Sequence, residues 1–334
     1  MNLPVLLVIQ FALCFFIQYL VLKYSQTHPF CIDRADADKP QSFHDVPTSR
    51  AGGLGIFIAI LPGMSFIGKE GVYIALSAIP VFMVGFYEDL KSNISPKIRL
   101  AIISTGAIAC MILMDSVIYD IGVIRFPYWI AVLFTIFAVT GVSNSINIID
   151  GFNGLASGVS IIAFSFFALT AYIHGDPLIF YFSVILIATI AGFFVWNFPK
   201  GKIFLGDGGA YVIGFLLAEA SVLLAKRNPD ISPWFPLVIL AYPIFEVVFS
   251  MYRRKFTQRL SPFEADRIHL HTLIYKRISR NNPKTSVYIW IVVAILGAIA
   301  FPFHSNTPVL IFMFIVFAIT YIYIYRRIVQ FKWL

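Results

Sequence analysis

Apolar stretches of about 20 residues recur along the whole chain, and this recurrence limits the folds open to it. The 334 residues are 59% hydrophobic and only 13% charged, whereas a soluble domain carries roughly a quarter charged residues. A stretch of this length crosses a bilayer as an α-helix, whose backbone groups are all paired internally. The sequence therefore predicts an all-α polytopic integral membrane protein, organised as a single membrane-embedded domain over residues 1–334.

The expected topology follows from the basic residues. The predicted spans are about 3–22, 52–68, 71–87, 99–115, 127–147, 155–173, 178–196, 209–225, 235–252, 286–303 and 308–325. With the N-terminus outside, 21 of the 25 Lys and Arg residues fall in cytoplasmic segments, as the positive-inside rule requires. Topology then accounts for the net charge of +8, and nucleic-acid binding is not expected. The first stretch lacks a signal-peptide pattern and is predicted to be a retained span.

Five short polar clusters interrupt this apolar sequence and carry most of its reactive groups. They are residues 44–50 (HDVPTSR), Glu88-Asp89, residues 144–154 (NSINIIDGFNG), residues 204–209 (FLGDGG) and residues 266–271 (DRIHLH). In the predicted topology all five lie on the cytoplasmic side. Carboxylates beside apolar helices are costly and usually mark a water-filled functional site. Together the clusters predict metal-assisted phosphate chemistry at the cytoplasmic membrane surface.

Two clusters place carboxylates at the ends of predicted spans. Glu88-Asp89 is an acidic pair that can hold Mg²⁺ or act as a base, because hard cations prefer oxygen ligands; ordinary boundary charges are the alternative. Asn144, Asn147 and Asp150 are spaced three residues apart, which puts them on one stripe of a helix. Polar packing between helices would explain one Asn but not all three groups.

The other clusters supply a glycine-flanked acid and a set of basic groups. Asp207 lies between glycines just before a span, and we expect a metal ligand there rather than only a helix cap. In DRIHLH, Arg267, His269 and His271 alternate with apolar residues, and their donors suit a diphosphate, although a solvated loop is the alternative. Asp45 and Arg50 lead into a span through Gly52-Gly53.

Two acids and three cysteines fall outside these clusters. Glu219 and Glu246 lie within predicted spans, and the sequence assigns neither of them a role. The cysteines show no CxxC spacing, so neither a disulfide framework nor a structural zinc site is predicted.

Taken together and in this order, the clusters resemble the polyprenyl-phosphate N-acetylhexosamine-1-phosphate transferases of glycosyltransferase family 4. These are relatives of the phospho-N-acetylmuramoyl-pentapeptide transferase of peptidoglycan synthesis. The resemblance is carried by DVPTSRAGG, GFYEDL, NSINIIDGFNG, FLGDGG and DRIHLH, between about His44 and Arg277. It implies an enzyme of the bacterial cytoplasmic (inner) membrane that transfers a sugar-1-phosphate from a UDP-sugar to undecaprenyl phosphate and releases UMP.

The resemblance also implies roles for individual residues. Asp89, the second acid of the Glu88-Asp89 pair, would activate the lipid phosphate. Asp150 fills the acidic position of the Asn-rich motif, where a catalytic residue and metal ligand is expected, and Asp207 fills the metal-binding position, with Mg²⁺ as the expected ion and Mn²⁺ as an alternative. Glu88 is a further catalytic candidate. Residues expected to contact the substrates are Asp45, Arg50, Asn144, Asn147, Asn153, Arg267, His269 and His271.

Three positions depart from the family pattern. Glu88 replaces the usual first Asp, Asn153 stands where an Asp is common, and Thr272 replaces a third His. An amide at Asn153 can still pair with uracil, because it offers both a donor and an acceptor. The extended sequence typical of the muramoyl-pentapeptide enzymes is not evident, so surface-polysaccharide synthesis is the expected branch.

Several alternatives stay open at the level of sequence. A secondary transporter of an anionic solute is the main rival. It predicts internal repeats and charges near mid-membrane, whereas the sequence shows no repeat and its acids cluster at one membrane edge. A scaffold descended from the enzyme would have lost Asp89, Asp150 or Asp207, and all three are present. Direct transfer and a covalent phospho-aspartate route are both compatible with the sequence. The sugar, the glycan and the oligomeric state, a homodimer included, are undetermined.

Overall fold

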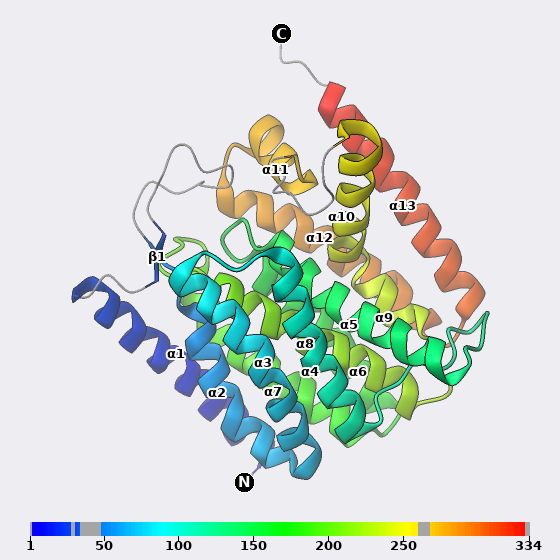
Figure 1. Ribbon diagram of the computed structural model, residues 1–334, viewed down its shortest axis with the longest axis horizontal. Helices are drawn as coiled ribbons and strands as arrows, with labels where there is room; N and C mark the ends of the chain where they lie inside the picture. The colour runs from blue at the N-terminus through cyan, green and yellow to red at the C-terminus, as the bar shows by residue number, and fades with distance from the viewer. Residues whose placement is uncertain (1, 28–30, 34–47, 260–267, 331–334) are drawn as a thin grey trace.

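The computed structural model describes residues 2–27, 31–33, 48–259 and 268–330, and helices make up most of this part of the chain (Figure 1). The α-helices are α1 (Leu3–Thr27), α2 (Gly52–Ile67), α3 (Lys69–Lys91), α4 (Pro96–Met114), α5 (Tyr128–Ile149), α6 (Leu155–Ile173), α7 (Pro177–Asn197), α8 (Gly206–Arg227), α9 (Trp234–Ile239), α10 (Ala241–Tyr252), α11 (Leu270–Ile274), α12 (Asn282–Ala300) and α13 (Thr307–Gln330). Shorter helical turns are η1 (Arg253–Gln258), η2 (Tyr275–Ser279) and η3 (Phe301–Phe303). Strands β1 (Ile32–Asp33) and β2 (Thr48–Ser49) pair antiparallel.

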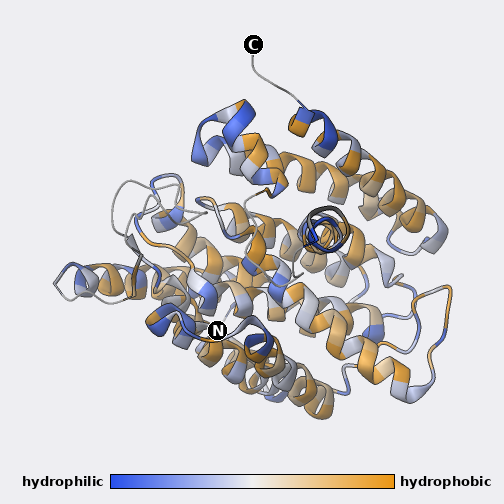
Figure 2. Ribbon diagram, turned by 45° about the horizontal axis from the view of Figure 1, so that its top comes forward, coloured by the Kyte–Doolittle hydropathy of each residue, from blue (hydrophilic) through white to orange (hydrophobic). Residues whose placement is uncertain are grey.

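The predicted all-α polytopic fold is confirmed. Within the described residues, nine helices are long and apolar enough to cross a membrane, namely α1, α3 to α8, α12 with η3, and α13. The shorter α2 is also apolar. Hydrophobic residues predominate along the long helices, while hydrophilic residues gather towards helix ends and loops (Figure 2).

The predicted span over residues 235–252 is not one continuous helix, because the chain is interrupted at Leu240 between α9 and α10. Pro243 follows three residues later and has no N–H to donate to the carbonyl of Ile239, so an unbroken helix would leave that carbonyl unpaired. The break makes α10 a separate element. It packs against α5 and α13, on the flank of the bundle where α11 and α12 also lie (Figure 1).

Helix α8 forms the centre of the bundle, and small residues let its neighbours approach closely. A Cβ on Gly85 of α3 would lie 2.6 Å from the carbonyl oxygen of Asp207. A Cβ on Gly214 of α8 would lie 2.7 Å from the Cα of Ser143 on α5. The Ser143 hydroxyl donates a hydrogen bond of 2.8 Å to the Tyr211 carbonyl of α8. Such contacts are typical of packing between membrane helices, and they bring the ends of α3 and α5 to the start of α8.

Candidate active site

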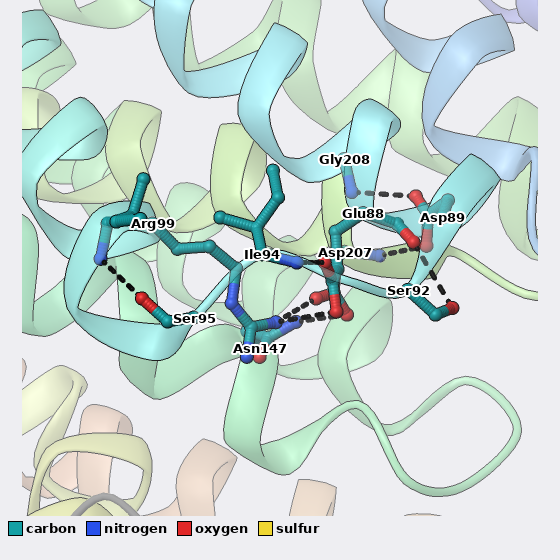
Figure 3. A network of polar contacts seen from close by, with 10 residues as sticks. Glu88, Asp89, Ser92, Ile94, Ser95, Arg99, Asn147, Asp207 and Gly208 are labelled. Atoms are coloured by element: carbon teal, nitrogen blue, oxygen red, sulfur yellow. Dashed lines mark hydrogen bonds and ion pairs between the residues drawn. The ribbon is translucent and has the colours of Figure 1, made fainter.

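The start of α8 is fixed by a carboxylate from the last turn of α3 (Figure 3). The two carboxyl oxygens of Asp89 accept hydrogen bonds from the backbone N–H groups of Asp207 at 2.8 Å and Gly208 at 2.9 Å. The first N–H groups of a helix have no partner within the helix, and a negative charge there is favoured by the helix dipole. Asp89, which is 9% exposed, therefore joins two helices at the point where two of the polar clusters meet.

Gly206 opens α8 in a conformation that only glycine adopts easily. Its φ is +74°, and an added Cβ would collide with the Arg50 carbonyl oxygen and lie 2.7 Å from Oδ2 of Asp89. A residue with a side chain is strained at this φ and has no room here. The glycines around Asp207 thus let three polar segments approach one another within van der Waals distance.

Residues 48–53 run beside residues 204–206 and are held there by backbone hydrogen bonds. Phe204 N–H donates to the Ser49 carbonyl at 2.8 Å, Gly52 N–H to the Phe204 carbonyl at 3.0 Å, and Gly53 N–H to the Leu205 carbonyl at 2.8 Å. These bonds join the segment that contains Arg50 to the one that contains Asp207. Two clusters more than 150 residues apart in the sequence therefore form one rigid edge of the site.

The Asp207 carboxylate is held from two sides. Asn147 of α5 donates to Oδ1 from Nδ2 at 2.9 Å, and Arg99 of α4 donates to Oδ2 at 2.6 Å. The Arg99 guanidinium also lies 3.7 Å from Oε1 of Glu88. The side chains of Arg99 and Asp207 remain 19% and 23% exposed, so the pair is accessible to a ligand as well as oriented by the fold.

Glu88 and Asp89 face different partners although they are adjacent in the sequence. Oε2 of Glu88 accepts the Ile94 N–H at 2.9 Å, which closes the turn between α3 and α4. Asp89 instead binds the start of α8. The two carboxylates of the acidic pair therefore bind different partners and do not face a common metal ion in this structure.

Asp150 follows the last residue of α5, and ionisation of its carboxyl is disfavoured by its surroundings. Desolvation raises the pKa of its carboxyl well above the usual range, and the charges of Asp207 and Asp89 raise it further, while Arg50 acts in the opposite direction. In the described part of the chain, no three His, Cys, Asp or Glu side chains form a ready-made metal site. Oxygen donors at Asp150 and Asp207 and the excess negative charge nevertheless fit a hard divalent cation.

The Asn-rich segment turns sharply after Asp150 and is anchored on both sides. Gly154 N–H donates to Oδ1 of Asn197 at 2.6 Å, and Asn153 N–H donates to Oδ1 of Asn282 at 2.8 Å. The Asn153 side chain donates from Nδ2 to the Pro199 carbonyl at 2.9 Å. Its expected pairing with uracil stays a prediction. Asn144 lies half-buried on α5, one turn before Asn147.

Of the two histidines, His271 lies against this turn, and His269 stacks on His271. Their rings are stacked, with centroids 5.2 Å apart and planes 6° apart, and the residues are only 3% and 2% exposed. Nε2 of His271 lies 3.7 Å from the place a Cβ on Gly151 would occupy. Burial lowers the pKa of His271 to about 3, so its imidazole is neutral at physiological pH. The expected contacts of Asp45 and Arg267 lie outside the described residues.

Two residues that contact the site side chains, Arg99 and Glu246, were not predicted from the sequence. Arg99 resembles an ordinary membrane-boundary base, and its only signal was a positive charge in the first turn of α4, close after the acidic pair. Glu246 was noted but given no role; in the structure its Oε1 lies 2.9 Å from Nδ1 of His269. A carboxylate six residues from the end of α10 and a motif beyond the next loop cannot be paired without knowing how α10 packs.

Comparisons with known proteins give concordant findings. A family model described as "Glycosyl transferase family 4" matches residues 72–225. The chain is 32% identical to the "Probable undecaprenyl-phosphate N-acetylglucosaminyl 1-phosphate transferase" of Bacillus subtilis (strain 168), over 72% of this chain and 69% of that protein. It is similar to two proteins named undecaprenyl-phosphate alpha-N-acetylglucosaminyl 1-phosphate transferase. That of Escherichia coli (strain K12) is 30% identical over 78% and 75% of the two chains, and that of Thermotoga maritima is 28% identical over 80% of each.

Proposed function

The chain belongs to glycosyl transferase family 4, the polyprenyl-phosphate hexosamine-1-phosphate transferases, and from this membership we propose its reaction in detail. It is a multi-pass membrane enzyme that transfers a sugar-1-phosphate to undecaprenyl phosphate. We infer that the donor is a UDP-sugar, with UDP-N-acetylglucosamine as the first candidate because the similar proteins are named for that sugar. The product, undecaprenyl-diphosphate-sugar, would initiate a surface polysaccharide.

In the proposed reaction an oxygen of the lipid phosphate attacks the β-phosphorus of the UDP-sugar. A new P–O bond forms between lipid and sugar phosphate, and the bond from the β-phosphorus to the bridging oxygen breaks. The electron pair leaves with that oxygen as UMP, so no further reactant is needed. Since two anions must meet, stabilisation of negative charge is the main task of the site.

Asp207 and Asp150 are the residues we propose to hold the metal ion, Mg²⁺ or Mn²⁺. When bound, such an ion would neutralise the diphosphate and act as a Lewis acid. The observation that carries this proposal is the fixed Asp207 carboxylate, held by Asn147 at 2.9 Å and Arg99 at 2.6 Å and close enough to Asp150 to raise its pKa. Arg99 is the cation we propose to bind a phosphate oxygen beside it.

Asp89 is proposed to accept the proton of the lipid phosphate, and direct transfer is the proposed route. Each carboxylate oxygen offers two lone pairs, so an oxygen that accepts an N–H of α8 can still accept that proton. We propose that His269, His271 and Arg50 act on the diphosphate, and Asn144, Asn147 and Asn153 on the nucleotide-sugar. Glu88 is proposed to support Arg99, at 3.7 Å, rather than to bind metal.

The proposed location is the bacterial cytoplasmic membrane, with the N-terminus outside and the site facing the cytoplasm. Support comes from the basic residues, since 21 of 25 lie on that side in the proposed topology. A soluble nucleotide-sugar would reach a cytoplasmic site directly. The transporter alternative is not favoured, because the similar proteins are named as transferases.

A direct assay tests this function. The purified protein in detergent is incubated with UDP-N-acetylglucosamine, undecaprenyl phosphate and Mg²⁺, and UMP is measured. We expect UMP only when all three are present, loss of turnover with EDTA, and at least a roughly 100-fold lower rate for Asp207→Asn, the scale on which an electrostatic group at a reacting phosphate acts. Asp230→Asn, an exposed acid outside the site, is the control. No UMP from a folded wild type with any UDP-N-acetyl sugar would contradict the proposal.

A further inference from the structure

Glu246 of α10 is fully buried, and its carboxylate has partners on several sides. Oε1 lies 2.9 Å from Nδ1 of His269. Oε2 accepts the Tyr321 hydroxyl of α13 at 2.7 Å, and the Leu270 N–H is 3.3 Å from both oxygens. A buried acid in a membrane helix is costly and usually functional. Neither the family resemblance nor the proposed reaction assigns a role to Glu246.

The contact with Glu246 determines which nitrogen of His269 carries a proton. A carboxylate can only accept hydrogen bonds, so Nδ1 of His269 is the protonated nitrogen and the ring orientation is fixed. The hydrogen bond made by one ring nitrogen of a histidine determines whether the other ring nitrogen carries a proton. Glu246 therefore fixes both the tautomer and the direction in which Nε2 points.

Helix α10 also contacts the second histidine, His271. Tyr242 lies four residues before Glu246, on the same face of the helix, and its hydroxyl is 2.9 Å from Nδ1 of His271. The two imidazoles are stacked, so fixing one restricts the other. Nε2 of His271 then faces Gly151, the residue after Asp150. A continuous series of contacts runs from Glu246 to the turn that carries Asp150.

The C-terminal helix completes this arrangement. Besides the bond from Tyr321 to Glu246, the Tyr325 hydroxyl donates to the Ile268 carbonyl at 3.1 Å, and Arg253 donates to the Tyr325 hydroxyl at 2.5 Å. Ile268 immediately precedes the first histidine. The segment from Ile268 to His271 is thus held between α10 and α13.

We propose that Glu246 is a positioning residue of the transfer reaction: it fixes His269, and through the stacked ring His271, against the Asp150–Gly151 turn beside the diphosphate. The inference rests on the proposed function. If Glu246 acts through His269, its substitution should change kcat and UDP binding only in a protein that still contains His269. A carboxylate that merely stabilises α10 would lack this dependence.

The test measures both turnover and binding in the full-length protein. Glu246→Gln keeps the shape but removes the charge, and we expect kcat to fall about tenfold and UDP to bind several-fold more weakly, which is the lower end of the range found when the partner that orients a metal-ligating His is removed. The matched control is Glu219→Gln, since Glu219 is equally buried but lies in α8 near Cys110, away from the histidines. Glu219→Gln should leave kcat and the Kd for UDP within about twofold.

A double-mutant cycle decides between positioning and simple stabilisation. The Kd for UDP is measured by calorimetry for Glu246→Gln, His269→Ala and the double variant, which needs no turnover. If Glu246 acts through His269, Glu246→Gln should cause no further loss of UDP affinity in the His269→Ala background. Two independent losses of affinity, whose factors multiply in the double variant, would overturn the inference. If Glu246→Gln does not fold, Tyr321→Phe, which removes only the 2.7 Å bond to Oε2, takes its place in the same cycle.

The two proposals fail in different ways. A folded wild type that releases no UMP overturns the proposed function, and this inference with it. A wild type that releases UMP, with Glu246→Gln equal to it in kcat and Kd, overturns the inference alone.

Discussion

Asp150 shows how a single residue can be poor for stability and suited to binding. Its carboxyl lies among other carboxylates, and desolvation with the charges of Asp207 and Asp89 raises its pKa in the folded protein. In the unfolded chain the same group has an ordinary pKa near 4. The folded state therefore holds this proton more tightly than the unfolded state does.

This difference predicts that Asp150→Asn stabilises the protein while it abolishes turnover. Below the unfolded pKa both states are protonated, and the two proteins should melt alike. As the pH rises from the unfolded pKa through the folded pKa, the unfolded wild type gains stability by ionising Asp150 while the folded wild type keeps the proton or ionises at a cost, and Asp150→Asn avoids this loss. Near pH 7 without divalent ions, we expect Asp150→Asn to raise the Tm by about 2 °C or more.

Melting curves in detergent across pH 4 to 8 check this prediction. Added Mg²⁺ should narrow the gap by stabilising the wild type alone, and Asp230→Asn, an exposed acid, should leave the Tm unchanged. A Tm for Asp150→Asn below that of the wild type at neutral pH would show that the carboxylate is instead well compensated.

At the residue scale, acids in an apolar chain were easy to find, and their partners were not. Asp89, Asp150 and Asp207 stand out because each is an acid at the end of a predicted span. Arg99 could not be assigned from the sequence, because its contact with Asp207 bridges 108 positions and depends on how α4 packs on α8.

At the scale of elements, the start of α8 depends on a single backbone conformation. Gly206 adopts φ +74° with the Arg50 carbonyl and the Asp89 carboxylate against it. An L-residue in this left-handed region is disfavoured by about 1–2 kcal/mol before any collision is considered. A change there must move Asp207, which is the next residue.

We therefore expect Gly206→Ala to lower kcat at least tenfold and to reduce the Tm, because about 1–2 kcal/mol of strain adds to the collision with the Arg50 carbonyl. Gly141→Ala is the control, since a Cβ there meets nothing within 4 Å in α5 and Ala favours a helix over Gly. UMP release and thermal melting of both variants provide the measurement. Equal activity of Gly206→Ala and wild type would mean that the α8 start tolerates rearrangement.

Element positions were largely predictable, since long apolar runs between polar clusters correspond to α1 to α8, α12 and α13. The interruption at Leu240 was not predicted, although Pro243 was a visible signal. Proline is tolerated inside many membrane helices, and the same structure retains Pro80 within α3. The sequence alone does not say which proline interrupts a helix.

At the scale of the whole molecule, the proposed orientation follows from the distribution of charge. Helix ends that carry Asp89, Asp150 and Asp207 meet at one end of the bundle, and the turn between α12 and α13 belongs to the opposite end. The basic residues assign the first end to the cytoplasm. Single cysteines can test this assignment.

An impermeant maleimide applied to intact spheroplasts should label Ser305→Cys in the turn before α13 and leave Lys200→Cys unlabelled. Both positions are exposed. Background from the native cysteines should be low, because Cys14 and Cys110 are buried and burial raises the pKa of Cys31 to about 12, which leaves little reactive thiolate. Permeabilised cells, in which both sites should react, are the control. The reverse pattern would invert the topology.

The meeting of the clusters at one end was predictable, because topology places them all on one side. The contacts between individual clusters could not be predicted. The hydrogen bonds from residues 48–53 to residues 204–206 and the position of His271 beside Gly151 depend on packing contacts that have no local sequence signal.

The bond from Tyr321 to Glu246 has a consequence for the order in which the enzyme is made. Translation delivers α13 after every other helix, yet this helix supports the histidine segment. A nascent chain that has already inserted α1 to α12 still lacks the hydroxyl that holds Glu246. Full affinity for the nucleotide-sugar would therefore arise only once α13 has been made and inserted, and truncation before residue 321 should yield an inserted protein that binds the nucleotide-sugar more weakly.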